Sequence, residues 1–205
     1  MPLFLADGAR GSQSNPRRMS FEGSFDFLSD ITHMFFVHKS KVCDADLEFL
    51  KEHLTLIDTQ LDKIDERANE HPDPDSFGVF DTAEGVTGLG FVACQWYLAA
   101  TYGFLRIDKK PALAAGPRHR SGMTIVEIVN QAANYWKHKD EWPLKKNVRD
   151  EVRITEALSA IGVSTERDYV LTSVLAEIAP SKPVRFRTLI SSLEGWRDTL
   201  REHAA

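Results

Sequence analysis

The longest periodic segment of the chain covers residues 44–70, which read DADLEFLKEHLTLIDTQLDKIDERANE. Its apolar residues recur every three or four positions without a slip, as they do on one face of an α-helix. Asp44 or Asp46 can cap the first turn, and Pro72 follows the last one. The segment therefore predicts one long amphipathic helix. Its apolar positions are Leu47, Leu50, Leu54, Ile57, Leu61, Ile64 and Ala68.

This apolar face can pack inside the protein or against another chain. Three heptads are short for an independent coiled coil, and the chain holds other apolar helices, so we expect an intramolecular bundle. Residues 20–42 repeat phenylalanines at helical spacing and predict a further helix.

A long helix is also predicted over residues 77–107, of which the part from Gly85 to Leu105 carries no charged residue. Such a segment either spans a membrane or lies at the centre of a soluble bundle. We expect the bundle, because glycines, threonines and Gln95 dilute the hydrophobicity. The glycine spacing does not match a dinucleotide fingerprint, so we interpret Gly88 and Gly90 as points of close helix approach.

The rest of the chain reads as a loop followed by helices. We predict a loop over 109–122, a helix over 124–142 that Pro143 ends, and shorter helices over 147–161, 167–178 and 185–202. The chain is thus expected to be all-α, a bundle of about six or seven helices with an up-and-down core and a smaller C-terminal helical layer. We predict a flexible arm over 1–19 and one helical domain over 20–205, with the main bundle in 20–142 and the C-terminal helices in 147–203.

Composition narrows the class of protein. The chain has 205 residues and a formal net charge of −5, which argues against a general nucleic-acid binder but leaves room for a local basic patch. Its two cysteines, Cys43 and Cys94, form no Cys-x-x-Cys pair, and residues 1–19 lack a secretory core. We therefore expect a cytoplasmic protein without a membrane segment.

The helix predicted over 124–142 carries the candidate site. One face holds Ile125, Val129, Ala132 and Trp136, and the opposite face holds Glu127, Gln131, Asn134, His138 and Glu141. The polar face is either exposed to solvent or lines a polar groove. Histidine suits proton transfer near neutral pH, and the flanking aromatic rings can exclude water or stack on a base.

We assign catalytic or binding roles to eight residues of this region. The catalytic candidates are His138, Asn134 and Glu141, and the ligand-binding candidates are Lys137, Trp136, Trp142, Gln131 and Arg149. His138 and Glu141 have the i, i+3 spacing of di-metal bundles, but no second Glu-x-x-His occurs, so we expect neither a metal nor a cofactor.

The element from Asn134 to Lys137-His138, late in a helix of an all-α chain, resembles the HEPN superfamily over about residues 20–142. The resemblance implies a small helical protein that cleaves RNA without a metal, or a degenerate relative that only binds RNA or a nucleotide. The family's catalytic signature places an arginine four to six residues before a histidine. Here an amide, Asn134 or Gln131, occupies that position, and elsewhere Arg197 precedes His203 by the allowed spacing.

Three functions follow as hypotheses. The first is a protein, expected to be a homodimer, that engages RNA or a nucleotide through His138. The second is a non-enzymatic interaction module that docks a partner protein through a helical face, either 47–68 or 20–42. The third is a small-molecule pocket beside Gln95, Trp96 and Tyr97, which a buried Gln95 without a partner would favour.

Overall fold

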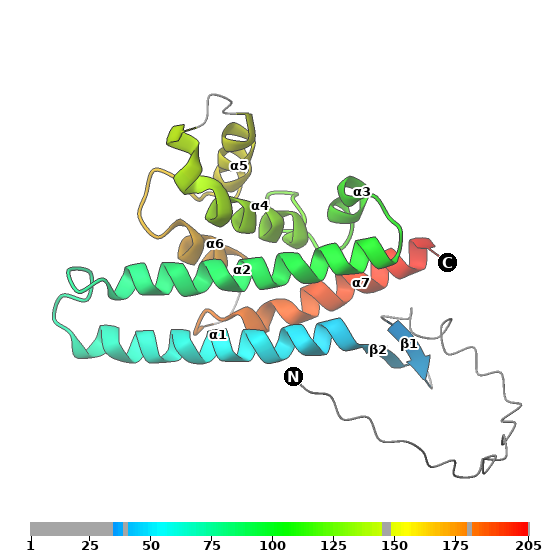
Figure 1. Cartoon of the computed structure of the whole chain (residues 1–205), viewed down its shortest axis with the longest axis horizontal. Coiled ribbons are helices and arrows are strands. Elements are labelled where there is room, and N and C mark those ends of the chain that lie inside the picture. Colours follow the sequence, from blue (N-terminus) through cyan, green and yellow to red (C-terminus); the bar gives the residue numbers. More distant parts are fainter. Residues whose placement is uncertain (1–34, 39–40, 145–148, 180–181, 205) are drawn as a thin grey trace, which may run out of the picture. The chain divides into compact units, whose positions relative to one another are not determined.

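The structure, a computed structural model, describes residues 35–38, 41–144, 149–179 and 182–204, all within a unit that spans Met34–Ala205. The arm predicted over 1–19 and residues 20–34 of the first predicted helix lie outside the described residues. Within them, seven α-helices and two short 3-10 helices confirm the all-α bundle (Figure 1).

The periodic segment forms α1 (Ala45–Glu70), as predicted. Asp44 caps it, because its Oδ1 accepts a hydrogen bond from the Leu47 amide at 2.9 Å. The predicted apolar face is buried inside the molecule, with Ile57 and Ala68 partly buried at its edges. The heptad face is thus core, and it is not available to dock a partner.

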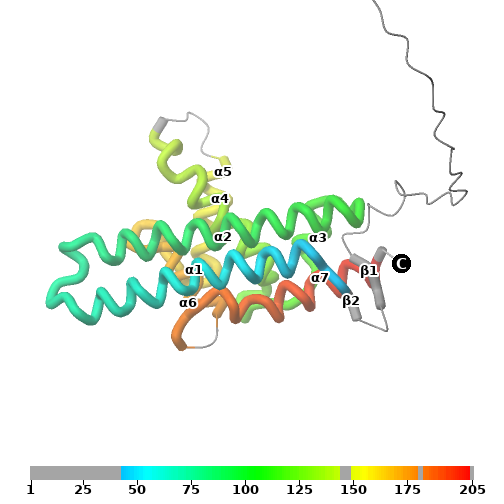
Figure 2. Tube along the Cα trace, turned by 60° about the horizontal axis from the view of Figure 1, so that its bottom comes forward, coloured from blue at the N-terminus to red at the C-terminus, as the bar shows by residue number. Residues whose placement is uncertain are grey.

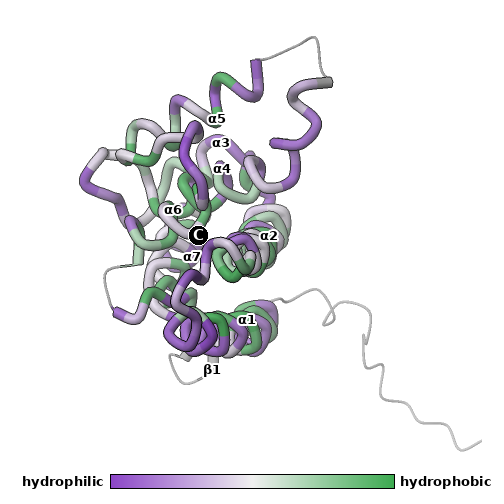
Figure 3. The backbone as a smooth tube through the Cα atoms, turned by 90° about the vertical axis from the view of Figure 1, so that its left-hand side faces the viewer, coloured by the Kyte–Doolittle hydropathy of each residue, from purple (hydrophilic) through white to green (hydrophobic). Residues whose placement is uncertain are grey.

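The uncharged segment forms α2 (Val79–Phe104), which runs antiparallel to α1 and beside it in both views (Figure 1, Figure 2). Its glycines allow close packing, as predicted. A Cβ atom on Gly88 would lie 2.3 Å from Cδ2 of Trp136, and one on Gly90 would lie 2.3 Å from Cε2 of Phe186. Colouring by hydropathy shows mixed polar and apolar residues in α1 and mainly apolar ones in α2 (Figure 3). No helix among the described residues is both long and apolar enough to cross a membrane.

The helix predicted over 20–42 is wrong at its C-terminal end. Residues Phe35–His38 (β1) and Lys41–Asp44 (β2) pair as two antiparallel strands, with Phe35 opposite Asp44. Short apolar runs fit a strand as well as a helix, and these runs are rich in aromatic and β-branched residues.

Two corrections concern prolines. The predicted loop 109–122 begins with a short helix, α3 (Lys109–Ala114), because Pro111 lies in the first turn, where its missing N–H costs nothing. The next helix, α4 (Ile125–His138), starts where predicted, with Thr124 as its cap, but ends before Pro143. It continues as a 3-10 helix, η1 (Lys139–Leu144), which contains that proline.

The C-terminal third forms α5 (Arg149–Ala160), α6 (Val170–Ile178), η2 (Phe186–Leu189) and α7 (Ile190–Ala204). The helix α7 packs beside α1 and α2: Lys51 pairs with Glu194 at 3.0 Å, and the rings of Tyr97 and Trp196 lie 6.2 Å apart. The helices α3 to α6 lie on the other side of α2 (Figure 1).

Buried carboxylates join these elements across the fold. Asp58 of α1 accepts from the Phe186 and Arg187 amides at 2.8 and 3.0 Å, so it caps η2. Glu84 of α2 accepts from the Leu171 amide at 2.7 Å and the Thr172 amide at 2.9 Å, so it caps α6. The helix predicted from residue 167 starts later than expected, because α6 begins after Tyr169. Each carboxylate satisfies helix N–H groups that would otherwise be unpaired.

Candidate functional site

A cavity of about 220 Å³ opens between the start of α3, the end of α4, η1 and the first turns of α5. We call it the α4–α5 cavity. Three of the residues proposed from the sequence line it, and they come from α4 and η1. The complete lining is Lys109, Asn134, His138, Trp142, Asp150, Glu151, Arg153 and Ile154.

The position of α4 explains why a polar stripe faces this cavity. The Thr124 hydroxyl accepts from the Glu127 amide at 3.1 Å and starts the helix. Asn134 and His138 then stand four residues apart on one face. Because α5 packs beside that face, part of the stripe is removed from solvent: Gln131 is buried, Asn134 and His138 are partly buried, and Glu141 is exposed.

A hydrogen-bond network fixes how Asn134 meets the cavity. The Lys137 ammonium, which can only donate, bonds to Oε1 of Gln95 at 2.6 Å. The Gln95 Nε2 must therefore point the other way, and it donates to Oδ1 of Asn130 at 2.9 Å and Oδ1 of Asn134 at 3.0 Å. With its oxygen turned to Gln95, Asn134 has its NH₂ group to offer to a ligand.

The same network answers the small-molecule hypothesis. Gln95 is partly buried, and both ends of its amide are engaged, by Lys137 on one side and by Asn130 and Asn134 on the other. A buried Gln95 without a partner would have favoured the hypothesis of a small-molecule pocket beside Trp96 and Tyr97. Gln95 has partners, so it gives that hypothesis no support.

Positive charge gathers at one side of the cavity. Partial burial, followed by the positive charges of Lys137 and Arg153, lowers the pKa of Lys109. The carboxylates of Asp150 and Glu151 lie in the first turn of α5, where the helix dipole favours them. Asp150 pairs with Arg153 at 3.3 Å, but both side chains are exposed, so this ion pair is weak. An anion between Lys109 and Arg153 would relieve the repulsion among the cations.

His138 and Trp142 form another wall. Nδ1 of His138 lies 3.4 Å from Oε2 of Glu141, a long contact between two half-exposed side chains. The Trp142 ring is partly buried and packs edge-on against Tyr135, with 5.6 Å between ring centroids. The indole is therefore held in place as an apolar surface on which a planar group can stack.

The other predicted residues lie elsewhere. Trp136 packs against Gly88 on α2, with the Lys139 ammonium 5.1 Å from its ring centroid, so it belongs to the helix contact. Gln131 is buried, and its Oε1 has no hydrogen-bond partner among the described residues. Arg149 lines a more open hollow on α5 next to the cavity, with Asp150 and Arg153 shared between the two.

Sequence analysis missed the contribution of Lys109, which was placed in a loop. Lys109 begins α3, and Arg153 comes from α5, so the two cations meet only in the folded chain. No local pattern around Lys109 indicates this role. Arg153 had a weak signal, because it belongs to the run of basic residues on either side of Pro143.

Arg197 and His203, the pair with the spacing of the HEPN signature, lie on α7 and do not line the α4–α5 cavity. Arg197 is buried, and its guanidinium donates to Oδ2 of Asp44 at 3.1 Å, whereas His203 is exposed near the C-terminal end of α7. Residues six apart on a helix also face different directions. Arg197 therefore serves the core, and it does not point to the same side as His203.

Metal ligation has no support among the described residues, in which no three His, Cys, Asp or Glu side chains are grouped to hold an ion. Glu84, the buried glutamate of α2, caps α6. No family model, curated protein or solved structure matches the chain.

Proposed function

We propose that this protein binds RNA or a nucleotide by a phosphate group in the α4–α5 cavity. The observation that carries the proposal is the crowding of Lys109 by Lys137 and Arg153, beside the donor group of Asn134. Arg153 has only a weak, exposed ion pair with Asp150, so these cations can still bind a phosphate ligand, whose oxygens accept charge-assisted hydrogen bonds.

The volume of the cavity limits how much of such a ligand can enter it. Its volume of about 220 Å³ is below the roughly 300–1,000 Å³ of most ligand pockets. It can hold part of one nucleotide, and a duplex is too wide for it. In this proposal Lys109 and Arg153 contact the phosphate, Asn134 donates to it or to the ribose, and Trp142 stacks on the base.

The HEPN resemblance extends the proposal to RNA cleavage. His138 would then transfer the proton of the attacking 2′-hydroxyl or of the leaving oxygen, and Glu141 would orient its ring through the Nδ1 contact. A degenerate member would bind without cleavage. The two versions share the binding site and differ only in the role of His138.

The test compares binding of single-stranded RNA and of a nucleoside monophosphate to wild type, Lys109→Ala and Lys110→Ala. Lys110 is the matched control, because it is an exposed neighbour that does not line the cavity. Loss of one charge-assisted hydrogen bond costs about 1.5–3 kcal/mol, so we expect Lys109→Ala to weaken binding roughly 10- to 100-fold. Lys110→Ala should stay close to wild type.

Fluorescence anisotropy and calorimetry measure these affinities. Equal losses in the two lysine variants would show non-specific charge attraction and would reject the cavity, as would wild type that binds neither ligand. In a parallel cleavage assay, His138→Ala should lower the rate about 10²- to 10⁴-fold while binding persists, if the protein is an RNase. Unchanged cleavage in that variant would remove His138 from the chemistry and leave the binding proposal standing.

A further inference from the structure

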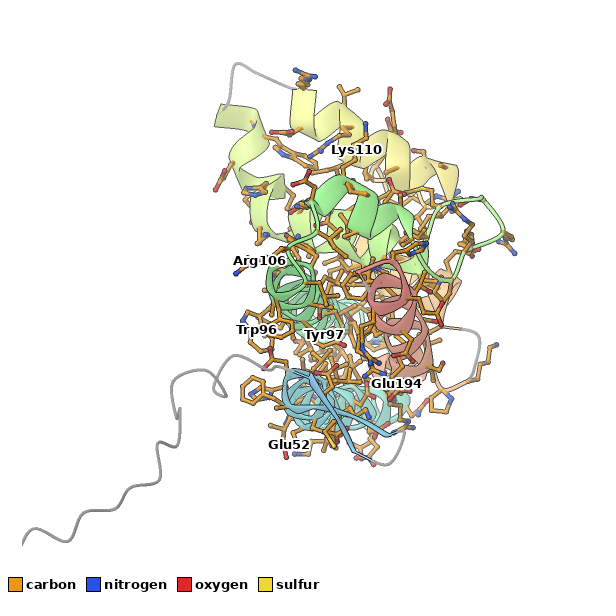
Figure 4. The ribbon with its side chains drawn as sticks, turned by 90° about the vertical axis from the view of Figure 1, so that its right-hand side faces the viewer. Glu52, Trp96, Tyr97, Arg106, Lys110 and Glu194 are labelled. Carbon is orange, nitrogen blue, oxygen red and sulfur yellow. The ribbon has the colours of Figure 1, made fainter. Side chains whose placement is uncertain are left out.

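The outer side of the α1 and α2 pair exposes large apolar residues. Phe49 is 50% exposed, Leu56 66%, Leu89 59% and Trp96 46%. Trp96 lies at the outer edge of α2, whereas its neighbour Tyr97 points between the helices (Figure 4). Single exposed apolar residues are normal on a protein surface, but a group of them marks an interaction site. We call this group, together with His53 and Ala93, the α1–α2 face.

One end of the face is hollow. The rings of Phe49 and Trp96 meet edge-on across the two helices, 5.5 Å apart, and the His53 ring lies 4.0 Å from Phe49. Around them lies a hollow of about 220 Å³ lined by Phe49, Leu50, His53, Ala93 and Trp96. Leu50, Ala93 and the aromatic rings make its surface almost wholly apolar.

The other end of the face protrudes. Leu56 follows Phe49 by seven residues on α1, and Leu89 precedes Trp96 by seven on α2. Because the helices are antiparallel, the two leucines stand beside each other, two turns or about 10 Å from the hollow. The face therefore carries a protrusion and a hollow at a fixed spacing.

The charge pattern also suits a covered surface. A helix side that faces water normally carries charged residues. The exposed positions of α2 between Gly85 and Leu105 carry none, and they include Leu89, Trp96, Ala99 and Gly103. Two copies of α2 can therefore approach without bringing like charges together, whereas on α1 the exposed Glu52 lies between Phe49 and Leu56.

The exposed area matches the centre of a protein interface. An aromatic side chain offers about 150–250 Å², so half-exposed Phe49 and Trp96 contribute roughly 100 Å² each. With the two leucines, the face exposes roughly 400 Å² of apolar surface, about half of the 800 Å² that each partner buries in a standard interface. Polar residues around the rim would supply the remainder.

We propose that two copies of this chain pair through the α1–α2 face. A twofold axis that crosses the helices midway between hollow and protrusion, near His53, sets the leucines of each copy over the hollow of the other. This fit occurs twice, as a self-complementary twofold interface requires. The occupant is a second copy because the face carries both halves of the fit.

Light scattering after gel filtration, with the full chain at micromolar concentration, tests the pairing. We expect wild type to have twice the monomer mass of 23.1 kDa, and Leu56→Glu and Leu89→Glu to be monomers. Val152→Glu is the matched control, because Val152 is 46% exposed but lies on α5, away from the face. It should remain a dimer, and circular dichroism should show all variants folded.

A cysteine at the axis tests the geometry. Two copies of His53→Cys should be joined by a short bis-maleimide, whereas Lys63→Cys, an exposed position further along α1, should not. Wild type controls for Cys43 and Cys94. A monomeric wild type would overturn the proposal, and if Trp96 were then shielded from a quencher, another occupant would cover the face. Loss of the dimer in Val152→Glu, or equal crosslinking at positions 53 and 63, would also overturn it.

Discussion

Lys137 determines which way the amide of Asn134 faces, although it acts through a third residue. Its ammonium can only donate, so Gln95 must turn its oxygen to Lys137 and its nitrogen to Asn134. Asn134 and Lys137 were both singled out in the sequence, but their relation to Gln95 was not. The link joins residues 42 positions apart, and no local pattern reveals it.

The candidate site was therefore only half predictable. Asn134, His138 and Trp142 were found because they lie within nine residues of one another in one helical segment. Trp136 belongs to the same segment but packs against Gly88. It was assigned to the site because a tryptophan of an apolar helix face and a tryptophan that stacks on a ligand look alike in sequence. Lys109 and Arg153 reach the cavity from other helices, so only tertiary contacts show them.

Among single residues, Cys94 offers a direct chemical test. Burial, and then the negative charge of Asp58, raises the pKa of the Cys94 thiol to about 12. The thiolate is the reactive form, so a disulfide reagent at pH 8 should modify the partly exposed Cys43 quickly and Cys94 only after unfolding. Peptide mass spectrometry counts the modified sites. Fast labelling of Cys94 in the folded protein would contradict its burial.

The pH dependence of this effect has a definite sign. The folded state holds the Cys94 proton more tightly than the unfolded state does. The resulting contribution to stability is complete below the ordinary thiol pKa of about 8.5 and is lost as the pH rises toward 12.

At the scale of elements, the helices with a continuous apolar face were predictable. The face of α1 repeats for more than six turns, and the structure buries it as expected. The errors fall where the signal is short. The strands β1 and β2 have four residues each, and α3 has six. In α5 the apolar Val152 is exposed, because Ile154 and Leu158 take the buried positions.

Helix starts were predicted well only where the cap is local. Asp44 and Thr124 cap the helices that follow them in sequence. The α6 helix is capped by Glu84, 87 residues before Leu171, so no residue near the predicted start at 167 marks where it begins. The burial of Glu84 in α2 thus has an explanation, because its carboxylate accepts hydrogen bonds from the first N–H groups of α6.

The close contact of α2 with Trp136 predicts a large effect of one methyl group. In Gly88→Ala the new Cβ would lie 2.3 Å from the indole, and such overpacking costs about 1–3 kcal/mol. The gain in helix propensity from glycine to alanine is at most about 1 kcal/mol, so the variant should be less stable. Urea denaturation followed by circular dichroism measures the difference.

Gly103→Ala is the matched control for that variant. It lies in the same helix, and nothing stands within 4 Å of its Cβ position. It should unfold at the same urea concentration as wild type or a slightly higher one. If Gly88→Ala were as stable as Gly103→Ala, α2 and α4 could not pack as closely as described.

For the whole molecule, one carboxylate connects the start of the fold to its end. Asp44, at the end of β2, accepts from the Leu47 amide with one oxygen. The other accepts from the Tyr97 hydroxyl at 2.8 Å and from the Arg197 guanidinium at 3.1 Å. The strand pair, α1, α2 and α7 thus share a single buried group, and α7 is held against the first two helices by a charge as well as by apolar contacts.

Asp44→Asn tests whether this junction holds the bundle together. The amide keeps the size of the side chain but leaves the buried Arg197 with Asp198, at 2.9 Å, as its one remaining acid partner among the described residues. Removing one member of a buried ion pair costs about 3–5 kcal/mol, so the free energy of unfolding should fall by about 3 kcal/mol.

Asp46→Asn provides the comparison, because it removes the same charge two residues away. Burial and the negative charge of Asp44 raise the pKa of Asp46, which means that its ionised form is already disfavoured in the folded state. Neutralising it should therefore leave the stability unchanged or raise it slightly. Urea unfolding of both variants, followed by helical signal and by tryptophan fluorescence, measures the two effects. An Asp44→Asn protein within 1 kcal/mol of wild type would mean that apolar packing alone holds α7 in place, since the rings of Tyr97 and Trp196 would then suffice to join α7 to α2.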